Sequence, residues 1–97
     1  MARKLTYDKN MNNDVILCRT YNELAGKHAC RHLLNESISY SKSWMHIPFF
    51  LRSRFKGHSE VCIISINRND YHTARRALED LEPRIRRRLA VNRLYAV

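Results

Sequence analysis

Two histidines, His28 and His32, stand four residues apart, a spacing that brings two imidazoles to one face of a helix. Such a pair can begin a metal site, but a third ligand is needed, and nothing in the sequence identifies one. The glutamate of an HExxH motif is absent because Ala29 follows His28. We therefore expect no metal and no other cofactor, and we interpret the two histidines as surface residues.

Carboxylates and glycines do not point to catalysis either. Neighbouring carboxylates occur at Glu79, Asp80 and Glu82, next to arginines, where surface ion pairs explain them. The chain has two glycines, too few for a phosphate-binding loop of the usual kind, and it has no GxSxG motif. The sequence predicts a protein that is not an enzyme.

Positive charge is the most informative property of the sequence. The 97 residues carry a net charge of +9, and two segments without any acid, residues 37–59 and 83–97, contain nine cations between them. A concentrated excess raises the local potential far more than dispersed charge does, so polyanions are the expected partners. The cations are Lys42, Arg52, Arg54 and Lys56 in the first segment, and Arg84, Arg86, Arg87, Arg88 and Arg93 in the second.

The first segment contains a predicted strand with a basic face. Arg52, Arg54 and Lys56 alternate along it, which would place their side chains about 7 Å apart on one side of a β-hairpin. That separation is close to the phosphate spacing of a single nucleic-acid strand, and Phe50 could stack on a base.

The second segment contains a predicted arginine-rich helix. Arg84, Arg87, Arg88 and Arg93 could follow a phosphate backbone, since the planar guanidinium suits bidentate phosphate contacts. Cations in the last turn of a helix interact favourably with its dipole, but this effect reaches only about one turn and does not explain five arginines. We therefore expect a small accessory or regulatory protein that binds RNA or DNA through the hairpin face and this helix.

A protein–protein interaction module is the alternative. Trp44, Phe49 and Phe50 lie near arginines, and aromatic residues with arginine are typical of interface centres. The chain would then be an adaptor, or an inhibitor of an acidic partner or of a nucleic-acid enzyme. A homodimer through a sheet edge or face is compatible with either function.

The order of the predicted elements gives an α+β domain with βαββα topology. A mobile basic arm, residues 1–13, precedes a single domain, residues 14–97. The strands are expected at 15–18, 49–56 and 60–66. The first helix is expected at 21–36, where Thr20 and Glu23 have capping-box spacing, and the second begins near Asp70. Pro83 should either kink this second helix or divide it into two helices that meet at Glu82, and the unbroken apolar stripe favours the kink. We expect a three-stranded sheet with both helices on one face.

Cysteine usage and hydropathy suggest a cytoplasmic protein. The three cysteines, Cys18, Cys30 and Cys62, lie in apolar stretches and are expected to be buried free thiols. No apolar run approaches 18 residues, and residues 1–13 lack the apolar core of a secretory signal, so we expect no membrane association.

Three stretches resemble the small βαββα domains of a family of signal-transducing proteins, which look like half of a ferredoxin-like fold. The resemblance covers residues 14–82. The chain differs from these domains at Ser37, where they usually have a turn glycine, and in its longer middle and its arginine-rich end. The resemblance implies the fold and no shared function. The matching stretches are Val15–Cys18, Leu33–Ile38 and Val61–Ile66, the last followed by Asp70, Ala74, Arg75 and Leu78.

Overall fold

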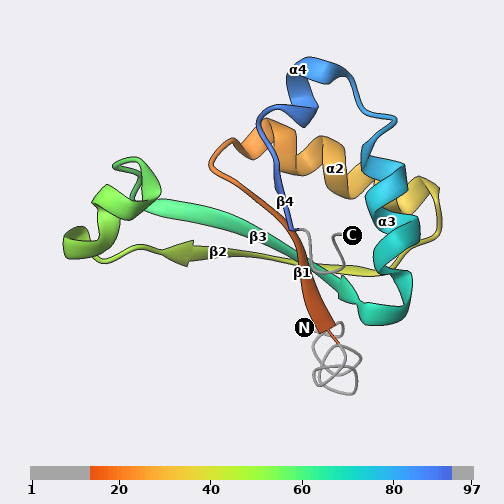
Figure 1. Cartoon of the computed structure of the whole chain (residues 1–97), viewed down its shortest axis with the longest axis horizontal. Helices are drawn as coiled ribbons and strands as arrows, with labels where there is room; N and C mark the ends of the chain where they lie inside the picture. The colour runs from red at the N-terminus through yellow and green to blue at the C-terminus, as the bar shows by residue number, and fades with distance from the viewer. Residues whose placement is uncertain (1–13, 93–97) are drawn as a thin grey trace.

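The computed structural model describes residues 14–92 of the chain (Figure 1). The predicted arm at 1–13 and the predicted site residue Arg93 lie outside the described residues. The strands are β1 (Asp14–Thr20), β2 (Tyr40–His46), β3 (Glu60–Asn67) and β4 (Ala90–Val91). The helices are α2 (Glu23–Asn35), α3 (Tyr71–Leu78) and α4 (Pro83–Arg86), with 3-10 segments η2 (Phe49–Phe55) and η3 (Arg68–Asp70).

The four strands form one antiparallel sheet in the order β2-β3-β1-β4. In this order β3 lies between β1 and β2, and β1 lies between β3 and β4. The chain therefore contains two interlocked split β-α-β units, the arrangement called ferredoxin-like. The predicted α+β class is confirmed. The predicted three-stranded βαββα sheet is wrong, because the short strand β4 adds beyond β1.

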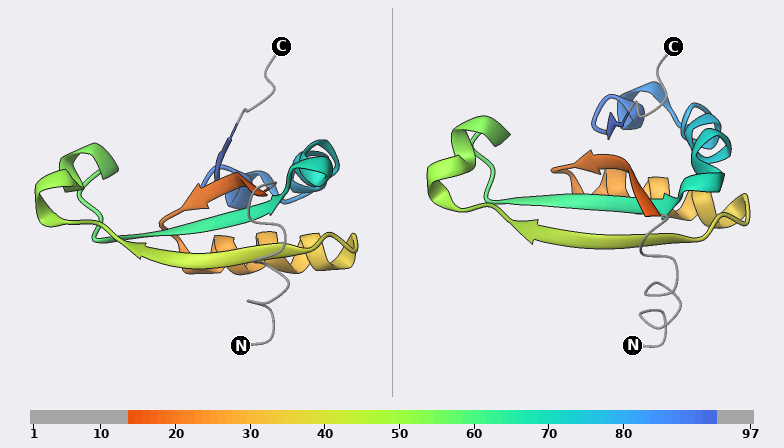
Figure 2. Two further views of the ribbon diagram at one scale, coloured as in Figure 1. Left: turned by 90° about the horizontal axis from the view of Figure 1, so that it is seen from below. Right: turned by 60° about the horizontal axis from the view of Figure 1, so that its bottom comes forward.

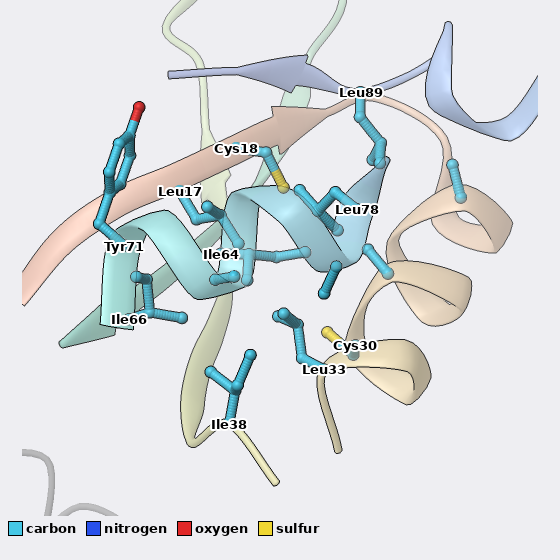
Figure 3. Packing of buried hydrophobic residues seen from close by; sticks show 14 of the residues in the cluster. Leu17, Cys18, Cys30, Leu33, Ile38, Ile64, Ile66, Tyr71, Leu78 and Leu89 are labelled. Carbon is cyan, nitrogen blue, oxygen red and sulfur yellow. The ribbon is translucent and has the colours of Figure 1, made fainter. Parts of the chain in front are cut away.

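The core lies between one face of the sheet and the helices α2 and α3, which also contact each other. The strands contribute alternate side chains such as Cys18, Ile64 and Ile66, which the antiparallel register places on the same face. Leu33 of α2 and Leu78 of α3 fill the space above them, as Figure 3 shows. Both longer helices thus cover one face, as the sequence predicted.

The second face of the sheet is open over its middle. Ile16 of β1 is 38% exposed, and Ser41, Ser43 and Ser65 lie on the same side by register. Towards one end Ile47 and Val61 lie on this face and are buried, although they are not part of the main core. Ile47 and Val61 lie at the end of the hairpin where the connection between β2 and β3 begins and ends.

Residues 49–55 form the 3-10 helix η2 and not the predicted strand. In each view of Figures 1 and 2, η2 lies at the end of the β2–β3 hairpin that is far from α3. Leu51, Arg52 and Phe55 are half-buried while Ser53 and Arg54 are exposed, a helical spacing of inward side chains. The predicted alternation of cations on a strand is therefore wrong.

The favoured kink at Pro83 is also wrong, and the alternative of two helices is correct, because α3 and α4 are separate helices. α3 ends at Leu78, and Glu82 is extended with φ −55° and ψ 142°. Steric conflict with a following proline disfavours the helical conformation at such a position. Pro83 then occupies the first turn of α4, where its missing amide costs nothing.

Candidate nucleic-acid interface

A hollow of about 380 Å³ lies where the end of β1, the segment after η2 and the α4–β4 connection meet. Four of the residues around it are cations, and no carboxylate is among the described residues that line it. The hollow is therefore strongly positive. Its lining residues are Arg19, Thr20, Tyr21, Asn22, Lys56, His58, Arg87, Arg88, Leu89 and Ala90.

Thr20 fixes one wall of this hollow. It is 2% exposed, and its hydroxyl donates a 2.6 Å hydrogen bond to the carbonyl of Arg88 while accepting one of 3.0 Å from the amide of Asn22. The first bond holds the α4–β4 connection against the end of β1, and the second fixes the turn into α2. The backbone from which the Arg88 side chain extends is therefore anchored.

The N-terminus of α2 adds positive potential on the same side. Asn22 caps the helix, accepting a 2.8 Å hydrogen bond from the amide of Ala25 on its side-chain oxygen. The predicted capping box from Thr20 to Glu23 is wrong, because the Thr20 hydroxyl is already engaged with Asn22 and Arg88. The N-terminal end of a helix dipole favours anions, and Asn22 lies in the hollow wall.

Another part of the lining comes from the turn that follows η2. Lys56 and Gly57 both have positive φ, 57° and 82°, so two consecutive left-handed residues reverse the chain. A side chain at Gly57 would meet no atom within 4 Å, so glycine is favoured here by its backbone conformation and not by space. The turn places His58 parallel to Tyr21, with ring centroids 3.9 Å apart and an interplanar angle of 11°.

The structure brings together residues from both acid-free segments. Lys56 comes from the first and Arg87 and Arg88 from the second, and all three were predicted site residues. Arg19 and the ring pair of Tyr21 and His58 were missed. A lone arginine inside an apolar strand was the available signal for Arg19, whereas the ring pair depends on the turn after η2.

Other predicted site residues lie outside the hollow. The Nε of Arg52 donates to the carbonyl of Ile47 over 3.1 Å, so this side chain braces the hairpin. Arg54 is exposed on η2, and Phe50 is 68% exposed with its ring edge-on to Phe49, 5.8 Å between centroids.

Arg84 is also outside it. Its Nε lies 3.2 Å from Oε1 of Glu82, an exposed ion pair. Both residues line a separate depression of about 690 Å³ that includes Asp80 and His28. This depression contains acids, so it is less positive than the hollow.

The histidine pair is not joined by further ligands. His32 Nε2 lies 3.8 Å from Oδ2 of Asp80, while His28 lines the acid-containing depression. Within residues 14–92, no group of three His, Cys, Asp or Glu side chains is placed to hold a metal ion.

The three cysteines are free and buried, as predicted. Burial raises the pKa of Cys18 to about 12, with further increases from Cys30 and Cys62. Burial also raises the pKa values of Cys30 and Cys62. Thiolate is the reactive form of cysteine, so these thiols are packing residues at neutral pH.

Comparison of the chain with protein-family models, with curated proteins and with solved structures finds no match. None of the helices in the described part of the chain is long and apolar enough to cross a bilayer.

Proposed function

We propose that the protein binds nucleic acid without catalysing a reaction, and that it holds phosphates in the basic hollow. The observation that carries this proposal is the convergence of cations from both acid-free segments: Lys56 from the first and Arg87 and Arg88 from the second line one hollow, together with Arg19. These residues lie far apart in the sequence and are neighbours in the fold. In this role the protein is a small cytoplasmic accessory or regulatory factor.

Electrostatics supports an anionic ligand there. Cations around one concave site repel one another, and no described carboxylate lines the hollow to offset this repulsion. A phosphate would relieve it, and guanidinium groups can bind phosphate through two parallel hydrogen bonds. The hydrogen bond from Thr20 to the Arg88 carbonyl fixes the backbone from which this side chain reaches the hollow.

Aromatic side chains support a nucleic-acid ligand over a simple anion. The stacked rings of Tyr21 and His58 lie in the hollow wall beside the cations. Phe50 and Arg54, exposed on η2, offer a second ring and a second cation further along the hairpin. Cations that follow a backbone and rings that accept bases are the usual elements of single-strand binding.

Salt dependence of binding tests the proposal. Affinity for a mixed single-stranded RNA and DNA pool should fall as salt concentration rises. The variant Lys56→Ala/Arg87→Ala/Arg88→Ala should reduce the magnitude of the slope of log affinity against log salt concentration by about two to three, since each phosphate contact contributes roughly 0.7 to 0.9. The matched control Lys27→Ala/Arg31→Ala/Arg76→Ala removes the same charge from exposed positions outside the hollow. Equal slopes for the two variants would refute the hollow as the binding site.

A protein-binding role is favoured by one separate observation. Four large apolar side chains are exposed at the hairpin: Trp44 at 39%, Met45 at 47%, Phe49 at 78% and Phe50 at 68%. Phe49 and Phe50 contact each other, and contiguous exposed apolar surface often marks an interface. Nucleic acid that co-purifies with the chain and leaves in high salt would favour the first function. A clean ultraviolet spectrum, with no salt-dependent binding to the pool, would favour a protein partner.

A further inference from the structure

Strand β2 is an open edge of the sheet. The order β2-β3-β1-β4 leaves one side of β2 without a strand partner among the described residues, along all seven positions from Tyr40 to His46. Its pairing with β3 runs from Tyr40↔Ile66 to His46↔Glu60 without a register shift, so this edge has no bulge to interrupt pairing. It contains no proline, and a regular edge of this kind is a template for another strand.

The register with β3 assigns each β2 side chain to a face. Tyr40, Lys42, Trp44 and His46 lie opposite Ile66, Ile64, Cys62 and Glu60, on the face that carries the helices. Ser41, Ser43 and Met45 lie on the open face. An added strand must match this division, because a slip of one residue would place each side chain on the opposite face.

A second copy of β2 satisfies this requirement in one particular register. When two β2 strands run antiparallel with all seven residues paired, Ser43 lies opposite the partner's Ser43. Lys42 then lies opposite the partner's Trp44, a pair that permits a cation–π contact, and Tyr40 lies opposite the partner's His46. On the open face Ser41 lies opposite the partner's Met45.

The neighbouring registers that keep the faces matched are worse. A shift of two residues in one direction shortens the pairing and places Lys42 opposite the partner's Lys42, with like charges in contact. The opposite shift also shortens the pairing and places Lys42 opposite the partner's His46. Strand length and charge therefore select the same register.

We propose that two copies of the chain pair through β2, antiparallel, with Ser43 on the two-fold axis. The two sheets then join into one continuous sheet, and the helices of both copies lie on the same side of it. This proposal does not depend on the proposed function, because its tests contain no nucleic acid.

Cross-linking of the full chain tests the register. Ser43→Cys should form a covalent dimer under mild oxidation, seen on a non-reducing gel, because paired residues lie within disulfide reach. In the proposed register Ser41 lies about 14 Å from the partner's Ser41, four residues along, so the matched variant Ser41→Cys should remain monomeric. The three native thiols are buried in both variants. A Ser41→Cys dimer that forms as readily as the Ser43→Cys dimer, or the absence of both, would overturn the proposal.

Sedimentation equilibrium gives an independent measurement without cysteine chemistry. The wild-type chain should dimerise, and Ser43→Lys should raise the dimer dissociation constant about fivefold or more, since it places two ammonium groups opposite each other. Ser41→Lys adds the same charge opposite the partner's Met45 and should leave the constant within about twofold. Unchanged circular dichroism would show that both variants fold. A monomeric wild-type chain at its highest soluble concentration contradicts the proposal.

Discussion

The body of the protein and the end of its hairpin have different construction. The body, formed by α2, α3 and the sheet beneath them, contains the whole main cluster of buried hydrophobic residues. In the hairpin end, residues 44–61, Ile47 and Val61 are buried, whereas four other large apolar side chains are exposed. Stability is therefore concentrated in one region, and groups available for contact are concentrated in the other.

The largest expected difference between the two regions is in the cost of shortening one buried isoleucine in each. Ile64→Ala should lower the free energy of unfolding by about 4 kcal/mol, because Ile64 is 0% exposed and surrounded by the main core. Ile47→Ala should lower the free energy of unfolding by about 2 kcal/mol, because Ile47 lies outside the main core and its neighbours can move into the cavity. Urea unfolding followed by circular dichroism measures both. Equal costs would mean that the hairpin end belongs to the same cooperative core.

High pH should destabilise the body through its buried thiols. Below pH 9 the Cys18 thiol is protonated in the folded and the unfolded chain, so pH has little effect. Above pH 9 the unfolded chain releases this proton, whereas the folded chain, with a Cys18 pKa of about 12, retains it. The free energy of unfolding should therefore decrease by roughly 2 kcal/mol from Cys18 alone at pH 10.5.

Urea midpoints at neutral pH and at pH 10.5 measure this loss. Cys18→Ala is the control, because removal of the thiol should flatten the alkaline decline whatever the variant costs at neutral pH. An equally steep decline in Cys18→Ala would assign the effect to other groups.

The smallest effect on stability is expected at the tip of the hairpin. Phe49→Ser/Phe50→Ser should change the free energy of unfolding by less than about 0.5 kcal/mol, because both rings are mostly exposed. The same variant should weaken binding to the true partner, whether a base stacks on the rings or a protein covers them. A large loss of stability would show that the tip supports the fold and is not a free contact surface.

Elements with a long apolar period could be predicted from the sequence. Ala25, Ala29 and Leu33 recur at four-residue spacing and lie in the core side of α2. Residues 60–66 are a short run rich in β-branched apolar residues, which is typical of a buried strand, and β3 covers them. In α2 one period fits over several turns, and in β3 the short length of the run and its β-branched residues favour a strand over a helix.

Short elements could not be predicted in the same way. In η2, Leu51 and Phe55 fit both an alternating strand and a helix, and the pattern is too brief to decide. β4 has two residues and is secured by Asn92, whose amide donates to Leu17 O over 2.8 Å and whose side chain donates to Ile16 O over 2.9 Å. These partners lie more than 70 residues away in the sequence.

In the candidate site, too, some features could be predicted from the sequence and others could not. Charge concentration predicted Lys56, Arg87 and Arg88, because composition alone reveals it. Their convergence with Arg19 depends on the left-handed turn at Lys56 and on the bond from Thr20 to the Arg88 carbonyl. Gly57 signals a turn at this place, but neither the left-handed conformation of Lys56 nor the bond from Thr20 leaves a local pattern in the sequence.

The order of the strands also limits how far assembly can proceed. Within the described residues one border of the sheet is β2, seven residues long and regular, and the other is divided between the two-residue β4 and the start of β1. A two-fold contact through β2 pairs this strand in both molecules. Only the interrupted border at β4 then remains at each end of the joined sheet. Growth by strand addition would then stop at a closed pair, and the protein would avoid open-ended fibres without needing charged residues to block them.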